Sequence, residues 1–174
     1  MNYYKIVIET VEASNQCYKG IARTDDYTPD IKNPRAYELW RKYVSSMGYI
    51  TTELSMAELL ELRQLMTEES KKQHEIIVFS ERKITSNDFT YYGIDVSSFG
   101  GYSILGEGLF NNSISHSTII AVLNIFFKEQ LNEYGLFQKA EIAECFKSVL
   151  LEMNEHSPGC IEDEDWKIIY VYGV

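Results

Sequence analysis

The sequence predicts an α+β fold, in which a single domain spanning residues 1–174 packs a mostly antiparallel sheet against about four helices. Segments with strand composition lie at the start, the middle and the end of the chain, and helical patterns separate them. Turn residues in the middle indicate a hairpin, which favours α+β over a series of βαβ units. The chain is 45% hydrophobic and contains three prolines, so we expect one folded core rather than a disordered chain.

One strand and two helices are predicted first. The opening "YYKIVIETV" is rich in β-branched and aromatic residues, which are typical of a strand. Asn33 and Pro34 suit an N-cap and a first helical position, and Gly48 suits the end of that helix. Ser55 and Glu58 have capping-box spacing and begin a second helix over about 56–72. We expect the apolar face of the first helix to comprise Tyr37, Trp40, Val44 and Met47, and that of the second Met56, Leu59, Leu62 and Met66.

The second half of the chain begins with a predicted hairpin. "HEIIVFSERKI" predicts a strand covered on both faces at its apolar centre, and the turn "TSND" leads from it to an antiparallel partner, "FTYYGIDV". Residues 115–134 predict the central, best-buried helix, because Ile119, Leu123, Phe126, Phe127 and Leu131 cover most of its circumference. A further helix begins near Gln138 and ends before "HSPG", with the stripe Ile142, Phe146, Val149, Leu150 and Met153. The closing "WKIIYVYGV" predicts a strand in the same sheet as the first.

Charge is distributed unevenly along the chain. The net charge of −10 weighs against binding to nucleic acid or to an anionic membrane, because phosphate binding requires clustered Lys and Arg. Residues 1–54 are balanced, whereas residues 138–165 carry eight acids against Lys139 and Lys147. The sharpest acidic feature is the run Glu162, Asp163, Glu164 and Asp165. Two interpretations stay open for it: a solvated connection into the last strand, or a patch that binds a basic partner.

The cysteines and the apolar segments bear on the compartment. Cys17, Cys145 and Cys160 are an odd number without a spaced framework, unlike a secreted disulfide scaffold. The start, "MNYYKIVIET", lacks the features of a signal peptide, and the apolar runs are too short to span a membrane. We therefore expect a cytoplasmic protein.

The stretch from Tyr91 to Asn112 contains five glycines in 22 residues, which raises the question of a phosphate-binding loop. Gly101 and Gly106 have the spacing of such a loop, but Glu107 and Gly108 stand where Lys and a hydroxyl residue are needed. We therefore expect turns and bulges rather than a nucleotide site, and no cofactor. Four aromatic residues between these turns could form a rigid contact surface: Tyr91, Tyr92, Phe99 and Tyr102.

No catalytic or metal-binding residue is predicted. None of His74, His116 and His156 has another His or Cys at helical metal spacing, and the CxxC pairs of structural zinc sites are missing from the sequence. Cys145 lies beside an apolar stripe, so we expect a small buried thiol. A site assembled from distant loops would not be visible in the sequence, which leaves an enzyme possible.

The segment "YYGIDVSSFGGYSILGEGLFNN" resembles segments of small bacterial immunity proteins that neutralise polymorphic or contact-dependent toxins. The resemblance covers 22 of 174 residues and rests on Gly-Ile-Asp-Val, a polar turn, a short strand with Ser and a further glycine. It implies a cytoplasmic, acidic, non-enzymatic protein that masks a toxin domain, and this is the function we expect. Two alternatives stay open: a small cytoplasmic enzyme with a substrate loop at residues 91–108, and a scaffold protein without a small ligand.

Overall fold

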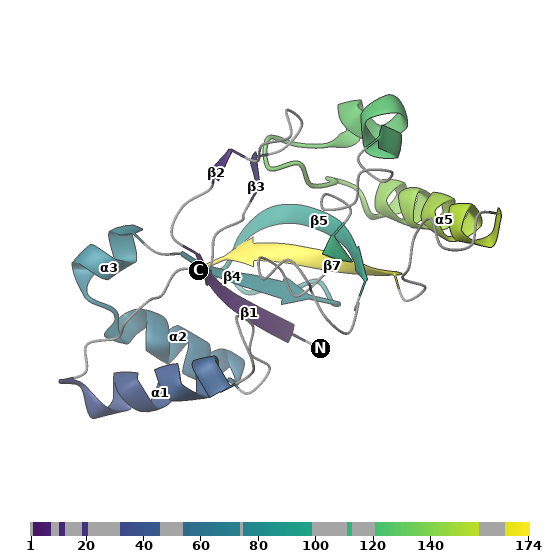
Figure 1. Cartoon of the computed structure of the whole chain (residues 1–174). Helices are drawn as coiled ribbons and strands as arrows, with labels where there is room; N and C mark the ends of the chain where they lie inside the picture. Colours follow the sequence, from purple (N-terminus) through teal and green to yellow (C-terminus); the bar gives the residue numbers. More distant parts are fainter. Residues whose placement is uncertain are drawn as a thin grey trace.

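The computed structural model describes residues 2–7, 11–12, 19–20, 32–45, 54–73, 75–98, 111–112, 121–156 and 166–174, and it confirms the predicted α+β class (Figure 1). The strands are β1 (Asn2–Val7), β2 (Val11–Glu12), β3 (Lys19–Gly20), β4 (Glu75–Ser80), β5 (Thr90–Ser98), β6 (Asn111–Asn112) and β7 (Trp166–Gly173). The helical elements are α1 (Pro34–Ser45), α2 (Met56–Leu65), α3 (Glu68–Gln73), the π-helical turn η1 (Leu123–Phe127), the 3-10 turn η2 (Lys128–Gln130) and α5 (Ala140–His156).

The main sheet has five strands in the order β1-β4-β7-β5-β6, and each neighbouring pair is antiparallel. The predicted hairpin between β4 and β5 is wrong, because the C-terminal strand β7 lies between them and pairs with both. The link from β4 to β5 is attached to β7 instead: the hydroxyl of Tyr172 accepts a hydrogen bond from the amide of Ile84 at 2.7 Å. The first and last strands share one sheet, as predicted, with β4 between them.

Strand β4 is buried on both faces, as its sequence predicts. Ile76, Ile77 and Val78 are all fully buried. Ile76 and Val78 pack with α1 and α2, whereas Ile77 on the opposite face packs with Leu136 and Val171. A strand buried on both faces reads as a continuous apolar run, which is why alternation is missing here.

Helix α1 begins where the sequence predicts, but its apolar face is different. The side-chain oxygen of Asn33 accepts hydrogen bonds from the amides of Arg35 and Ala36, which is N-cap geometry. Leu39 is fully buried against α2, whereas Tyr37, a predicted core residue, is 41% exposed and stacks on Trp40. The side chain of Val44, Met47 and the predicted end at Gly48 lie outside the described residues.

The second predicted helix is in fact two helices. Its capping box is confirmed, since Ser55 and Glu58 exchange the expected hydrogen bonds. The helix breaks at Met66, whose ψ of 143° is extended, and the hydroxyl of Thr67 caps α3 by accepting from the amide of Ser70. This break lets the buried Met66 side chain pack into the core that α2 forms with the sheet.

A second core cluster lies at the other end of β7, under α5 (Figure 1). Three rings meet there in edge-to-face or tilted geometry, those of Phe127, Phe137 and Phe146, with centroids 5.1 to 6.0 Å apart. Trp166 at the start of β7 completes this core. The α5 stripe predicted from the sequence is confirmed, because Phe146 and Leu150 are fully buried.

The helix predicted over 115–134 is the main error of the sequence prediction. Helical structure is described from residue 121 and ends at Gln130 after a π turn and a 3-10 turn. Leu123 and Phe127 are buried as predicted, but Phe126 is 71% exposed. This segment is therefore a rim of the core rather than its centre.

Candidate protein-binding surface

The outer face of α5 is an acidic stripe. Glu141, Glu144, Glu152 and Glu155 are all exposed, and they follow the helical period on the side opposite Phe146. Lys147 is the one cation within the helix, so four acids face one base. We call Glu141, Glu144, Glu152 and Glu155 the acidic face of α5.

Most of the acidic face has no ionic partner among the residues that the structure describes. The ion pairs between described residues include one on α5, a long contact of 4.0 Å between Glu144 and Lys147. None of them reaches Glu141, Glu152 or Glu155. Glu152 and Glu155 also lie at the carboxyl end of the helix, where negative charge opposes the helix dipole. These glutamates therefore do not serve the stability of α5.

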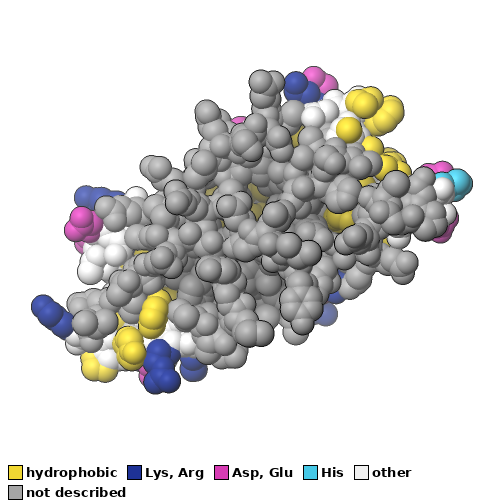
Figure 2. Space-filling model, in the orientation of Figure 1, with side chains coloured by type: hydrophobic (Ala, Val, Ile, Leu, Met, Phe, Trp, Pro, Cys, Tyr) yellow, Lys and Arg dark blue, Asp and Glu magenta, His cyan; other side chains and the backbone are white. Residues whose placement is uncertain are grey.

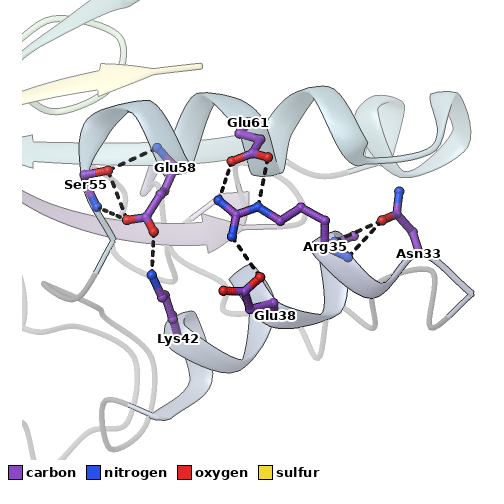
Figure 3. A network of polar contacts seen from close by, with 8 residues as sticks. Asn33, Arg35, Glu38, Lys42, Ser55, Glu58 and Glu61 are labelled. Atoms are coloured by element: carbon purple, nitrogen blue, oxygen red, sulfur yellow. Dashed lines mark hydrogen bonds and ion pairs between the residues drawn. The ribbon is translucent and has the colours of Figure 1, made fainter.

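The glutamates of α1 and α2 contrast with this arrangement, because they are paired within the fold (Figure 3). Arg35 donates from Nε and Nη2 to the two carboxylate oxygens of Glu61 at 2.9 and 2.7 Å, and from Nη1 to Glu38 at 2.8 Å. Bidentate Arg–carboxylate pairs are specific in geometry, so this contact sets how α1 lies along α2. We assign these charges to the fold rather than to a partner.

The second pair of the network joins Lys42 of α1 to Glu58 of α2 (Figure 3). The hydrogen bond from Lys42, together with those from the amide and hydroxyl of Ser55, lowers the pKa of Glu58 to about 2. The guanidinium of Arg35 likewise lowers the pKa of Glu61. Both carboxylates are thus held in the charged form.

Beside α1 there is an open pocket of about 350 Å³, lined by Pro34, Tyr37, Glu38, Arg41 and Lys42. In Figure 2 hydrophobic and basic side chains gather over α1, at the lower left. The lining of the pocket contains the cations Arg41 and Lys42 and the acid Glu38. It lies away from α5, which Figure 1 places at the opposite end of the sheet.

An exposed apolar pair lies on η1, next to α5. Ile125 and Phe126 are each 71% exposed, although their neighbour Phe127 packs against Phe146 of α5 with ring centroids 5.1 Å apart. Figure 2 shows hydrophobic side chains gathered on the surface over this turn, at the upper right. We call Ile125 and Phe126 the η1 pair.

The π-helical geometry explains why Phe126 is outside. A π turn holds about 4.4 residues, against about 3.6 in an α turn. In an α-helix Phe126, three positions after Leu123, would lie close to the same face as Leu123. In the wider π turn the rotation per residue is smaller, so Phe126 does not reach that face. Phe127, four positions on, returns to the core instead. The helical period used in the sequence prediction therefore placed Phe126 on the wrong side.

The loop after η2 is tied to β5 and so fixes η1 against the sheet. The side chain of Asn132 donates to the main-chain oxygen of Tyr92 at 2.7 Å and accepts from the amides of Tyr134 and Leu136 at 3.0 Å. Phe137 then forms a two-hydrogen-bond bridge with Ile94, at 2.8 Å each way. These bonds hold the turn of residues 131–137 against β5.

Gly93 makes this close approach possible. A β-bulge lies between Tyr91 and Gly93, and Gly93 has a φ of +148°, which side-chain-bearing residues rarely adopt. A Cβ atom there would lie 2.6 Å from that of Leu136. The expectation that glycines of this stretch serve bulges is confirmed for Gly93. Gly100, Gly101, Gly106 and Gly108 lie outside the described residues.

Two of the predicted contact residues, Tyr91 and Tyr92, are described, and they lie on opposite faces of β5. Tyr91 is 43% exposed and packs beside Tyr172 with ring centroids 5.4 Å apart. Burial, followed by the nearby phenols of Tyr172 and Tyr170, raises the pKa of Tyr91 to about 12. Tyr92 is half-buried against Tyr134, so most of it serves packing. These two tyrosines do not form one surface.

The other predicted contact residues lie outside the described residues: Phe99, Tyr102, Glu162, Asp163, Glu164 and Asp165. Sequence reasoning missed the α5 face and the η1 pair. The signal for α5 was present, since four glutamates recur opposite a clean apolar stripe. No signal in the sequence pointed to the exposure of Phe126, because the π turn that causes it has no recognised pattern.

The described part of the chain includes residues of the kinds that bind metals or react as thiols. No group of three or more His, Cys, Asp and Glu side chains there could hold a metal ion. Cys145, expected to be buried, is exposed, because it lies one turn after Glu141 on α5 and so shares the outward side of the helix with it. None of the helices described is both long and apolar enough to cross a membrane.

The fold and the surface define an α+β protein with an acidic helix beside an exposed apolar turn. Comparisons with protein-family models, with curated proteins and with solved structures found no match. Its function is therefore argued from its own residues.

Proposed function

We propose that this protein is a non-enzymatic binding domain, an immunity-type inhibitor that neutralises a basic toxin domain in a bacterial cell. The observation that carries the proposal is the acidic face of α5, whose glutamates are exposed and, within the described part of the chain, mostly without ionic partners. Unpaired surface charge of one sign attracts a partner of the opposite sign and raises its rate of association. The resemblance of residues 91–112 to immunity proteins supports the same conclusion.

Apart from Glu141, which lies in the first turn, the face is also unfavourable for the helix that carries it. Glu141 with Glu144 and Glu152 with Glu155 are like-charge pairs three residues apart, which cost isolated helices a few tenths of a kcal/mol. Between α1 and α2, by contrast, glutamates are paired with cations of the fold, as Glu58 and Glu61 show. The repulsion between the α5 glutamates is not offset by contacts within the described fold. This supports a role in binding, in which a partner supplies the positive charge.

Growth rescue tests this proposal. A panel of toxin domains, some basic and some acidic, is expressed in bacteria with and without this chain. Wild type should restore growth against a basic domain, and the fourfold change of the acidic face to Lys should abolish rescue. The matched control reverses Glu68 and Glu69, exposed acids on α3 at the other end of the molecule.

Two outcomes would contradict the proposal. Equal rescue by the α5 variant and by wild type would show that the acidic face is not the contact. A folded chain that rescues growth against no domain of the panel would favour a scaffold role instead.

A further inference from the structure

We propose that the η1 pair is the apolar anchor of this protein, which inserts into an apolar pocket rimmed by Lys and Arg on a basic protein partner. The inference rests on the proposed function and names the chemistry of the contact. Single exposed hydrophobic residues are common on protein surfaces, but two adjacent large ones, each 71% exposed, form a patch that water solvates poorly. Burial of Ile125 and Phe126 in a partner would remove that cost.

The anchor is held rigidly before any partner arrives. Leu123 and Phe127, the residues at the two ends of the π turn, are both buried in the core under α5. Phe127 is held by two rings, those of Phe137 and Phe146. A preorganised apolar side chain loses little entropy on binding, which is a property of hot-spot residues.

The surroundings of the anchor determine the charge of its partner. Phe127 packs directly on Phe146, so η1 and α5 share one wall of the core and the acidic face belongs to the same end of the molecule (Figure 1). An apolar anchor at the same end of the molecule as the acidic face is complementary to an apolar pocket with a basic rim. An acidic partner would meet repulsion from Glu144, Glu152 and Glu155.

A second copy of this chain is the main rival occupant, since the pocket beside α1 has Arg41 and Lys42 in its lining. Lys42, however, is already paired with Glu58, and Glu38 lines the same pocket. The positive charge of Arg41 and Lys42 in that pocket is therefore largely balanced by Glu38 and Glu58. We assign the anchor to a different protein and make self-association an outcome of the test.

The test uses two short amphipathic helical peptides with the same Leu and Phe face, one flanked by Lys and the other by Glu. Backbone amide spectra of the full chain are recorded during titration with each peptide. The Lys peptide should shift the signals of Ile125, Phe126 and α5, and Phe126→Ser should weaken its binding about tenfold or more, as expected for a hot spot. Tyr37→Ser, at an exposed aromatic residue on α1, is the matched control and should leave the affinity unchanged.

Each other outcome overturns the inference. If the Glu peptide binds as tightly as the Lys peptide, charge does not select the partner. If Phe126→Ser binds the Lys peptide with unchanged affinity, Phe126 is not the anchor. Sedimentation that shows a dimer of the wild type, dispersed by Phe126→Ser, would assign the pair to self-association. Growth rescue separates the two proposals. If Phe126→Ser still rescues growth, the immunity function stands and the anchor does not. If the Lys peptide binds through Phe126 but the wild type rescues growth against no toxin domain, the anchor stands and the immunity function does not.

Discussion

The side-chain amide of Asn132 donates a hydrogen bond to the main-chain oxygen of Tyr92 at 2.7 Å. This bond attaches the loop that follows the exposed turn η1 to the bulge of β5. The same side chain accepts from two amides of its own loop, so one residue organises the turn and its contact with the sheet. The position of the candidate binding surface therefore depends on a side chain that is not part of it.

Replacement of Asn132 should separate these two roles. Asn132→Ala removes all three hydrogen bonds and should lower the free energy of unfolding by about 2–4 kcal/mol, because it leaves backbone groups without partners. Asn132→Asp keeps an acceptor for the amides of Tyr134 and Leu136 but turns a second acceptor oxygen towards the main-chain oxygen of Tyr92, so it should lower stability through the contact with β5 and not through the turn. Urea unfolding measures both. Equal stability of Asn132→Ala and wild type would show that water replaces these bonds without cost.

Gly93→Ala should lower the free energy of unfolding by about 2–4 kcal/mol. The added methyl group would meet Leu136 at 2.6 Å, and the φ of +148° would strain any L side chain. Gly135→Ala is the matched control. Its φ of 69° disfavours a side chain, and this backbone strain should cost about 1 kcal/mol. A Gly93→Ala protein as stable as the control would disprove the close packing of the loop on β5.

Phe126→Ala should change the free energy of unfolding by less than about 0.5 kcal/mol, because the side chain is mostly exposed. Phe127→Ala, one residue along, should lower it by about 3–5 kcal/mol through lost burial and a residual cavity. Thermal or urea unfolding of the two variants tests the π turn directly. If both variants lose a similar free energy of unfolding, Phe126 is buried as well, as in the central helix that the sequence predicts.

The pair of Lys42 and Glu58 should make stability depend on pH in the acidic range. The pKa of Glu58 falls from 4.5 to about 2 on folding, so its stabilising effect is complete above about pH 4.5 and is lost as the pH falls towards 2. Glu58→Gln should therefore be less stable than wild type at pH 7, and the difference should shrink across that interval. Glu129→Gln, at an exposed acid on η2, is the control. A difference that stays constant from pH 7 to 2 would contradict the assignment.

Charge reversal on α5 should raise stability at one end of the helix and lower it at the other. Glu152→Lys and Glu155→Lys place positive charge at the carboxyl end, so each should raise the free energy of unfolding by about 0.3–1 kcal/mol. Glu141→Lys makes the same change at the amino end and should lower it by a similar amount. Thermal unfolding at low salt measures all three. Destabilisation by Glu152→Lys and Glu155→Lys would show that these acids serve the fold and not a partner.

Local patterns predicted the parts of the fold that depend on neighbouring residues. The capping box of Ser55 and Glu58, the N-cap Asn33 and the apolar stripe of α5 are all as predicted, because a few adjacent side chains decide each of them. The apolar run of β4 indicated its burial on both faces for the same reason. The α+β class followed from the order of these elements.

Only the tertiary structure decided the pairing of the sheet and the exposed surface. The strand β7 lies between β4 and β5, where its backbone forms hydrogen bonds with both strands. This pairing joins segments far apart in the chain, so no local sequence pattern predicts it. Phe126 is exposed because Phe127 takes the place between Phe137 and Phe146, and the backbone widens to a π turn to allow it. The sequence by itself determined where several helices and strands begin, as at Asn33 and Ser55. The packing of the core determined which apolar side chains are buried, such as Phe127, and which are exposed, such as Phe126.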